Sequence, residues 1–383
     1  MDYPIISADD HIDQNFLPKD LWTSRVPEKY REAAPRVVET PDGPAWVCGG
    51  QKWSPWSLRP GQMQQSSGRR HALEKGGVLE FGVNRPTDTQ LRLADMDRDG
   101  VYASVMYGPV APLSIPDPDL RRVSYRAYND WLAEFCATAP DRLIGVGLLP
   151  SDDPAGAADE VRHLGQAGIR EGMLLAARAE PALWDPAWEP LWAAAAEASV
   201  AIGFHLSGGV RSFSDKAEHA THLGNRGTNL AVLPMQMDEP LAAVIFSGAL
   251  ERHPGLKIVL AETGIGWIPY FLERMDDSYG RFLDAEEYWR THGGLQLKMK
   301  PSEYFKRQVW ATFQIDKVGL RLLDVMGADK VMWASDYPHP DSTWPDSQKA
   351  IAEQFAGVSE ENRRKVLHDN AKSLYGIGSS VRA

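Results

Sequence analysis

The chain has 383 residues, of which 43% are hydrophobic and 24% are charged, a composition typical of a soluble globular protein. Its 41 basic and 52 acidic residues leave a formal charge of -11, which argues against nucleic acid or an anionic membrane as the main partner. No run of about 18 apolar residues and no N-terminal signal segment occurs, so we expect a cytoplasmic protein without a membrane partner. Two cysteines, Cys48 and Cys136, are too few for a disulfide framework and lack metal-site spacing.

Short β-rich apolar runs alternate with amphipathic helical patterns along the chain. Eight runs are predicted strands: YPIISADDH from Tyr3, VYASVMYG from Val101, RLIGVGLLP from Arg142, IREGMLLA from Ile169, VAIGFHLS from Val200, LKIVLAETG from Leu256, QVWATFQ from Gln308 and KVMWASDY from Lys330. Most of them are almost continuously apolar, as expected of parallel strands buried on both faces. Four stretches between them are predicted helices: residues 124–138, 154–168, 186–198 and 241–252.

The repeated alternation of strand and helix predicts an α/β fold that closes as a (β/α)8 TIM barrel with right-handed crossovers. A doubly wound open sheet is the alternative arrangement of the same elements. No G-x-G-x-x-G motif follows any predicted strand. Doubly wound sheets commonly bind dinucleotides through this motif, so its absence argues against the open sheet. We therefore predict a barrel and no nucleotide cofactor.

Two segments are too long to be simple connections in a barrel. Residues 13–91 follow the first strand and include PDGPAWVCGGQKW, which predicts a small hairpin. Residues 207–238 follow the fifth strand. Long insertions at the C-terminal ends of barrel strands usually cover the active site. Because no internal repeat or linker is evident, we predict one domain over residues 1–383, with 13–91 as an inserted subdomain over the barrel mouth.

Polar side chains stand at the C-terminal ends of four predicted strands. Asp9 and His11 end the first strand. Residues two apart in a strand point to the same side, so both side chains can reach one ion while Asp10 faces away. The other three end the fifth, sixth and eighth strands: His205, Glu262 and Asp336. In a barrel all of these positions face the same mouth.

These five residues predict a site for one or two divalent metal ions. Considered singly, each residue could have a purely structural role. For example, His205 could be a core histidine, and Glu262 could cap the turn at Gly264. Burying a carboxylate costs several kcal/mol, however, so three acids in an apolar barrel call for a neutralising cation. Carboxylate and imidazole ligands suit Zn, Mn or Fe, and the excess of carboxylate shifts the preference modestly toward Fe or Mn.

Several segments together resemble the amidohydrolase superfamily: ISADDHI, LPKDLWTSRVPEKYREAAPRV, RLADMDRDGV, YNDWLAEFCATAPDRLIGVGLLP, LAETGIGWIP and WASDYPHPDSTWP. More narrowly they resemble its amidohydrolase 2 branch, which is named for aminocarboxymuconate-semialdehyde decarboxylase. The resemblance implies a distorted barrel that binds one or two metal ions at its mouth. The family's first-strand His-x-His or Glu-x-His falls on Asp9 and His11, its fifth-strand histidine on His205 and its eighth-strand aspartate on Asp336. No lysine lies in EGMLLAA to bridge two metals, so Asp9, Glu262 or Asp336 would have to do so.

The chain departs from this branch at Glu262, where the decarboxylases carry a catalytic histidine. The imidazole that would deliver a proton to the carbon that loses carbon dioxide is therefore missing, and we expect decarboxylation not to be the main reaction. We expect a metal-dependent hydrolase instead, acting on a small amide, ester or thioester through a metal-activated water, with Glu262 or Asp336 as the catalytic proton acceptor. The alternatives are a dinuclear non-haem iron oxygenase, a nonoxidative decarboxylase, and a structural-metal subunit of a hetero-oligomer.

Further polar residues lie near the predicted site. His219 and His222, three apart in EHATHLGN, could meet on one helical face, and His222 is a candidate ligand for a second metal. His339 in YPHPD could orient a ligand. Arg70 and His71 could bind a substrate carboxylate, with solvated surface charge as the alternative. The expected partners are a small-molecule substrate and other subunits of a homo- or hetero-oligomer.

Overall fold

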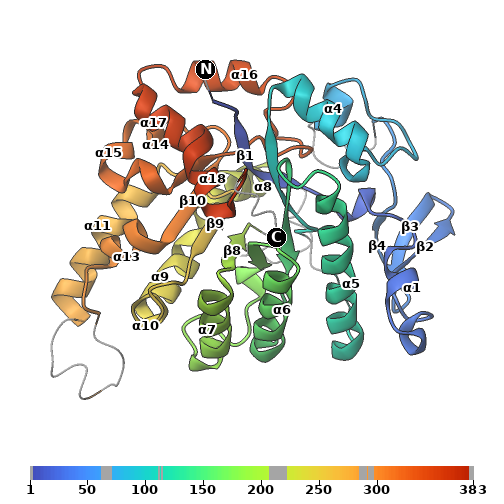
Figure 1. The fold of residues 1–383 in the computed structure, drawn as a ribbon, viewed down its shortest axis with the longest axis horizontal. Helices are drawn as coiled ribbons and strands as arrows, with labels where there is room; N and C mark the ends of the chain where they lie inside the picture. Colours follow the sequence, from blue (N-terminus) through green and yellow to red (C-terminus); the bar gives the residue numbers. More distant parts are fainter. Residues whose placement is uncertain are drawn as a thin grey trace.

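All eight predicted strands form in the computed structural model, which describes residues 3–61, 71–110, 113, 115–206, 222–283, 291 and 297–378 (Figure 1). The strands are β1 (Ile6–His11), β5 (Ala103–Tyr107), β6 (Leu143–Leu148), β7 (Glu171–Leu174), β8 (Ala201–His205), β9 (Ile258–Ala261), β10 (Val309–Phe313) and β11 (Val331–Trp333). They form one sheet in that order, and all neighbouring strands pair in parallel. The predicted (β/α)8 barrel is therefore confirmed.

The barrel closes between β1 and the segment that follows β11. The backbone N–H of Asp336 donates to the carbonyl of Asp9 at 2.9 Å, and the N–H of His11 donates to the carbonyl of Tyr337 at 2.6 Å. The pairing of β1 with β5 shifts register between Ser7 and Asp10. The irregularity thus lies in the part of β1 that carries the predicted ligands, where irregular pairing commonly re-aims a side chain.

The helices follow local signals in the sequence. Their bounds are α4 (Thr89–Asp99), α5 (Pro118–Ala137), α6 (Pro154–Gln166), α7 (Glu189–Ala198), α9 (Asp238–Phe246), α10 (Ala249–Arg252), α11 (Ile268–Ser278), α13 (Pro301–Gln308), α14 (Lys317–Arg321), α15 (Leu323–Met326), α16 (Ser347–Gln354), α17 (Glu360–Arg364) and α18 (Asn370–Tyr375). Helix α5 begins earlier than predicted, because the Asp117 side chain caps it and Pro118 occupies its first position. The helix predicted at 241–252 is divided into α9 and α10, since Gly248 between them has a φ of 76°.

The first insertion contains a small antiparallel sheet of β2 (Arg36–Thr40), β3 (Gly43–Cys48) and β4 (Gln51–Pro55). The predicted hairpin corresponds to β3 and β4, and β2 adds a third strand. This sheet and α1 (Leu21–Arg25) lie beside α5 (Figure 1). The indole of Trp22 in α1 donates to the carbonyl of Ser124 in α5 at 3.0 Å. This part of the insertion is thus fastened to the flank of the barrel.

The later part of the same insertion packs near the closure of the barrel. Leu73 in α3 (Ala72–Lys75) shares a buried apolar cluster with Phe16, Tyr337 and Trp344. Tyr337 directly follows Asp336, so this cluster lies against the segment that carries a predicted ligand. The extent of the subdomain over the mouth stays a prediction, because residues 62–70 lie outside the described part of the chain.

The second insertion is described only from residue 222 onward, where α8 (Leu223–Val232) and the 3₁₀ helix η7 (Leu233–Met237) lead into α9. Among the described residues, no helix has both the length and the apolar character needed to cross a membrane.

Candidate metal centre

The alternation predicted at the end of β1 is present. Asp9 and His11 are fully buried on one side of the strand. Asp10 faces away from them and accepts hydrogen bonds from the hydroxyls of Ser7 at 2.7 Å and Ser335 at 2.6 Å. Because Ser335 precedes Asp336, the hydrogen bond to Asp10 connects β1 to the segment after β11 that carries the predicted metal ligand Asp336.

Asp9 lies between two imidazoles and a hydroxyl. Its Oδ1 is 3.4 Å from Nε2 of His205 and 3.5 Å from Nε2 of His11. Its Oδ2 accepts a hydrogen bond of 2.9 Å from Thr312 at the end of β10. The Nδ1 of His205 lies 2.8 Å from the carbonyl oxygen of Leu206. A hydrogen on Nδ1, held by that carbonyl, leaves Nε2 of His205 available to coordinate a metal.

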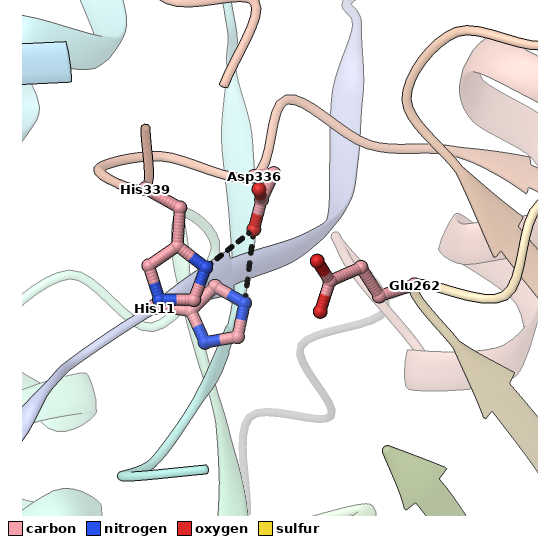
Figure 2. Close-up of side chains that lie close together, drawn as sticks. All are labelled: His11, Glu262, Asp336 and His339. Atoms are coloured by element: carbon pink, nitrogen blue, oxygen red, sulfur yellow. Dashed lines mark ion pairs between the residues drawn. The ribbon is translucent and has the colours of Figure 1, made fainter. Parts of the chain in front are cut away.

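Asp336 joins a second set of side chains (Figure 2). Its Oδ1 lies 3.1 Å from Nε2 of His11 and 3.0 Å from Nδ1 of His339. The rings of His11 and His339 are stacked with centroids 3.8 Å apart. Glu262 lies opposite this pair, with its carboxylate turned toward Asp336 and His11 (Figure 2), and its Oε2 is 3.8 Å from Nε2 of His205.

The two carboxylates that follow β9 and β11 sit on unusual backbone. Glu262 has a φ of 56° and Asp336 a φ of 62°, in the left-handed region that non-glycine residues rarely adopt. Such a conformation costs on the order of 1–3 kcal/mol and clusters at functional sites. The N–H of Glu262 donates to Thr312 Oγ1 at 2.7 Å, which holds the strained turn to the neighbouring strand.

The residues present fit a divalent cation. Among the described residues, both ring nitrogens of His11 and both carboxylate oxygens of Asp336 are buried and have no polar partner outside the cluster of Asp9, His11, Asp336 and His339 itself. Buried polar atoms of this kind are costly unless they are satisfied, and a cation would satisfy them. The donor atoms form two groups, and within each group all of them lie within 4.8 Å of one another. The first group is Asp9, His11 and His205, and the second is His11, Glu262, Asp336 and His339. His11 belongs to both groups, so the geometry accommodates one ion or two adjacent ions.

The charges in the metal-free site perturb the pKa values strongly. Burial lowers the pKa of His205, but the Asp9 and Glu262 carboxylates and the contact with the Leu206 carbonyl together outweigh burial and raise it to about 9. Burial would raise the pKa of Asp336, whereas His339 and His11 hold it well below its usual range. Burial and the charge of Asp336 raise the pKa of Glu262 well above its usual range. The site therefore combines an ionised carboxylate with one that favours its protonated form.

Two residues at the site were not found by sequence reasoning. Asp13 Oδ2 lies 3.3 Å from Nε2 of His339, so that imidazole is held between Asp13 and Asp336. The period of two in Asp9, His11 and Asp13 was the signal that could have found Asp13. Thr312 carried no comparable signal, because a threonine in a strand is most often a packing residue.

The structure brings five predicted residues together and leaves others elsewhere. Asp9, His11, His205, Glu262 and Asp336 converge, as expected for strand ends in a barrel. His222 is not among them: its side chain is exposed, and its Nδ1 accepts a hydrogen bond of 3.1 Å from the N–H of Gly224 at the start of α8. The ring thus acts as a helix cap. His219 and Arg70 lie outside the described residues.

The sequence matches proteins of known function. A family model described as amidohydrolase covers residues 83–377. The γ-resorcylate decarboxylase of Rhodococcus jostii (strain RHA1) is 28% identical over 303 residues, which cover 75% of this chain and 87% of the relative. The 2-amino-3-carboxymuconate-6-semialdehyde decarboxylase of Dictyostelium discoideum is 24% identical over 301 residues, covering 76% of this chain and 77% of the relative.

Solved structures share the fold. An amidohydrolase from Mycobacterium avium subsp. paratuberculosis superposes with a TM-score of 0.72 at 22% identity, covering 98% of this chain and 100% of that one. A dihydroxybenzoic acid decarboxylase from Polaromonas sp., solved with manganese and the inhibitor 2-nitroresorcinol, superposes with a TM-score of 0.63 at 19% identity. The alignment with the latter covers 98% of this chain and 97% of that one.

These findings correct the reading of the site as that of a hydrolase. Both sequence relatives described above are decarboxylases, so the interpretation as an amide, ester or thioester hydrolase is wrong, and with it the argument against decarboxylation. The argument against decarboxylation treated Glu262 as an ordinary ionised glutamate. In the metal-free site, burial and the charge of Asp336 raise its pKa well above the usual range.

Proposed function

Because the chain belongs to the amidohydrolase family, we propose that it is a metal-dependent, nonoxidative decarboxylase that acts on a hydroxylated aromatic carboxylic acid. The observation that carries the proposal is the match to γ-resorcylate decarboxylase over 75% of this chain and 87% of the relative. The set of carboxylate and imidazole donors at the barrel mouth supports it.

Four side chains would hold the cation: Asp9, His11, His205 and Asp336. Oxygen and imidazole nitrogen donors suit manganese, iron or zinc. When bound, the cation would supply Lewis acidity to the carboxylate and neighbouring hydroxyl oxygens of the substrate. Asp13 and His339 would keep the His11 ring in place, because His339 stacks on His11 and is itself held by Asp13.

Glu262 would supply the proton. In the reaction, the bond between the ring carbon and the carboxylate carbon breaks, and carbon dioxide leaves without the bonding electron pair. That pair stays on the ring carbon, which then takes the proton of the Glu262 carboxyl and leaves a carboxylate behind. Glu262 fits this role by position, since it faces the other site residues from the end of β9 and its side chain is 18% exposed. Such a positioned acid contributes roughly 10²- to 10⁴-fold in rate.

The test is a screen of aromatic acids with manganese-loaded protein, measuring release of carbon dioxide. We expect turnover of 2,6-dihydroxybenzoate or 5-carboxyvanillate and none of benzoate, which lacks the neighbouring hydroxyl. In deuterium oxide the product should carry one deuterium at the carbon that lost the carboxylate. The Asp336→Asn protein serves as the negative control. Absence of carbon dioxide release from all hydroxylated acids by metal-loaded protein would refute the proposal.

A further inference from the structure

We propose that His71 donates a hydrogen bond from Nε2 to a ring oxygen of the substrate other than the pair that binds the metal. The inference rests on the proposed function and deepens it, because it names a group that the substrate must carry. His71 lies in the first insertion and forms the N-cap of α3. Its side chain is 1% exposed, so it is not the solvated surface residue that was the alternative from sequence.

The two ring nitrogens of His71 are in different situations. Nδ1 accepts a hydrogen bond of 3.4 Å from the backbone N–H of Leu73. A ring nitrogen that accepts carries no hydrogen, so in the neutral ring the hydrogen lies on Nε2. Burial lowers the pKa of His71 to about 4, which keeps the ring neutral near pH 7. His71 therefore presents a fixed, uncharged N–H donor.

That donor has no partner among the described residues, although Nε2 is buried. Buried donors are nearly always paired, so the partner of Nε2 lies outside the described residues, and the partner that we propose is a bound ligand. Nδ1 accepts from the backbone of α3, so helix capping accounts for Nδ1 but not for the buried Nε2. An acceptor from a ligand would pair with Nε2.

His71 belongs to the surroundings of the metal centre. The carboxylates of Asp13 and Asp336 raise the pKa of His71 and His339 lowers it, so all three lie within electrostatic range of the ring. The ring also lies 5.7 Å from that of Phe16, which follows β1 closely in the chain. The insertion thus brings a neutral donor within electrostatic range of the metal centre.

A neutral donor recognises oxygen without adding charge. It suits a hydroxyl or phenolate on an aromatic ring, at a position away from the substrate oxygens that a bound metal ion would polarise. A site that hydrogen-bonds such an oxygen discriminates against analogues that lack it, because binding them leaves the buried donor unpaired. We therefore infer that the substrate carries a second ring oxygen.

Two analogues and two variants test this inference on the manganese-loaded protein. The coloured ligands 2-nitroresorcinol and 2-nitrophenol differ only by the second hydroxyl, and their binding is followed by absorbance. His71→Asn keeps an N-cap for Leu73 but has no donor at the Nε2 position, whereas His71→Gln places an amide N–H near that position. Manganese content and circular dichroism establish that both variants are folded and loaded.

We expect His71→Asn to weaken binding of 2-nitroresorcinol about tenfold, equivalent to about 1.4 kcal/mol, and to leave binding of 2-nitrophenol within twofold. His71→Gln should retain most of the wild-type affinity for 2-nitroresorcinol. Equal losses for both ligands, or no loss for either, would overturn the inference, because then the N–H serves the fold or a bound water. If neither ligand binds the wild-type protein, the proposed class of substrate fails, and this inference fails with it.

Discussion

The hydroxyl of Thr312 donates a hydrogen bond of 2.9 Å to the Asp9 carboxylate, although the two residues lie 303 positions apart in the chain. The same Oγ1 accepts from the backbone N–H of Glu262 at 2.7 Å. One side chain on β10 therefore holds both a proposed metal ligand on β1 and the proposed proton donor after β9. Partners of this kind orient metal ligands and influence how tightly the metal is held.

Replacing Thr312 with valine should weaken metal binding. The substitution keeps the shape of the side chain but leaves Asp9 Oδ2 and the N–H of Glu262 without their partner. We expect the affinity for manganese to fall by roughly 10- to 100-fold, measured by titration of the metal-free protein. Thr312→Ser is the matched control and should retain most of the affinity. Equal affinities in wild type and the valine variant would show that Thr312 does not support the site.

Replacing His205 with alanine should remove most of the bound metal. Its Nε2 faces Asp9 at 3.4 Å inside the barrel, so the substitution removes one donor from the group formed by Asp9, His11 and His205. Elemental analysis of protein purified from metal-supplemented cells measures the loss. His222→Ala is the matched control and should keep its metal, since that side chain is exposed and caps α8. If His222→Ala lost its metal and His205→Ala kept it, His222 would be a metal ligand and His205 would not.

Replacing Glu262 with glutamine should lower kcat by roughly 10²- to 10⁴-fold on a substrate found by the screen, because the amide cannot deliver the proton. Metal content should change less than in His205→Ala. Glu262→His, which places an imidazole at this position, should recover part of the rate. Glu273→Gln, on the exposed face of α11, is the control and should be fully active. Wild-type turnover by Glu262→Gln would show that Glu262 does not donate the proton and only caps the turn after β9.

Buried His71 should make the metal-free protein less stable in acid. The pKa of an unperturbed histidine is about 6.5 and that of His71 in the folded chain is about 4, so the unfolded state binds more protons between these values. The free energy of unfolding should then fall as the pH drops from 7 toward 4, by up to about 3 kcal/mol from this residue. Urea titrations across this range, made with a chelator, measure the fall. The fall in the free energy of unfolding should be smaller in His71→Asn than in the wild-type protein. Identical pH dependence in the two proteins would contradict a lowered pKa for His71.

The sequence alone determined the barrel and most of the candidate site. Eight apolar runs separated by helical patterns predict parallel strands, and parallel strands place their C-terminal ends at one mouth. The convergence of His205 and Asp336 follows from that rule without coordinates. The opposite directions of Asp9 and Asp10 follow from the period of two in a strand, which depends on local geometry only.

Only the tertiary structure decided how these residues are supported and which protons they carry. The contacts of Thr312 with Asp9 and of His339 with Asp13 join distant segments, and no spacing in the sequence records them. The raised pKa of Glu262 and the lowered pKa of His71 depend on burial and on neighbouring charges, which exist only once the barrel has closed. Local periodicity reports where a side chain points, but not what it meets there.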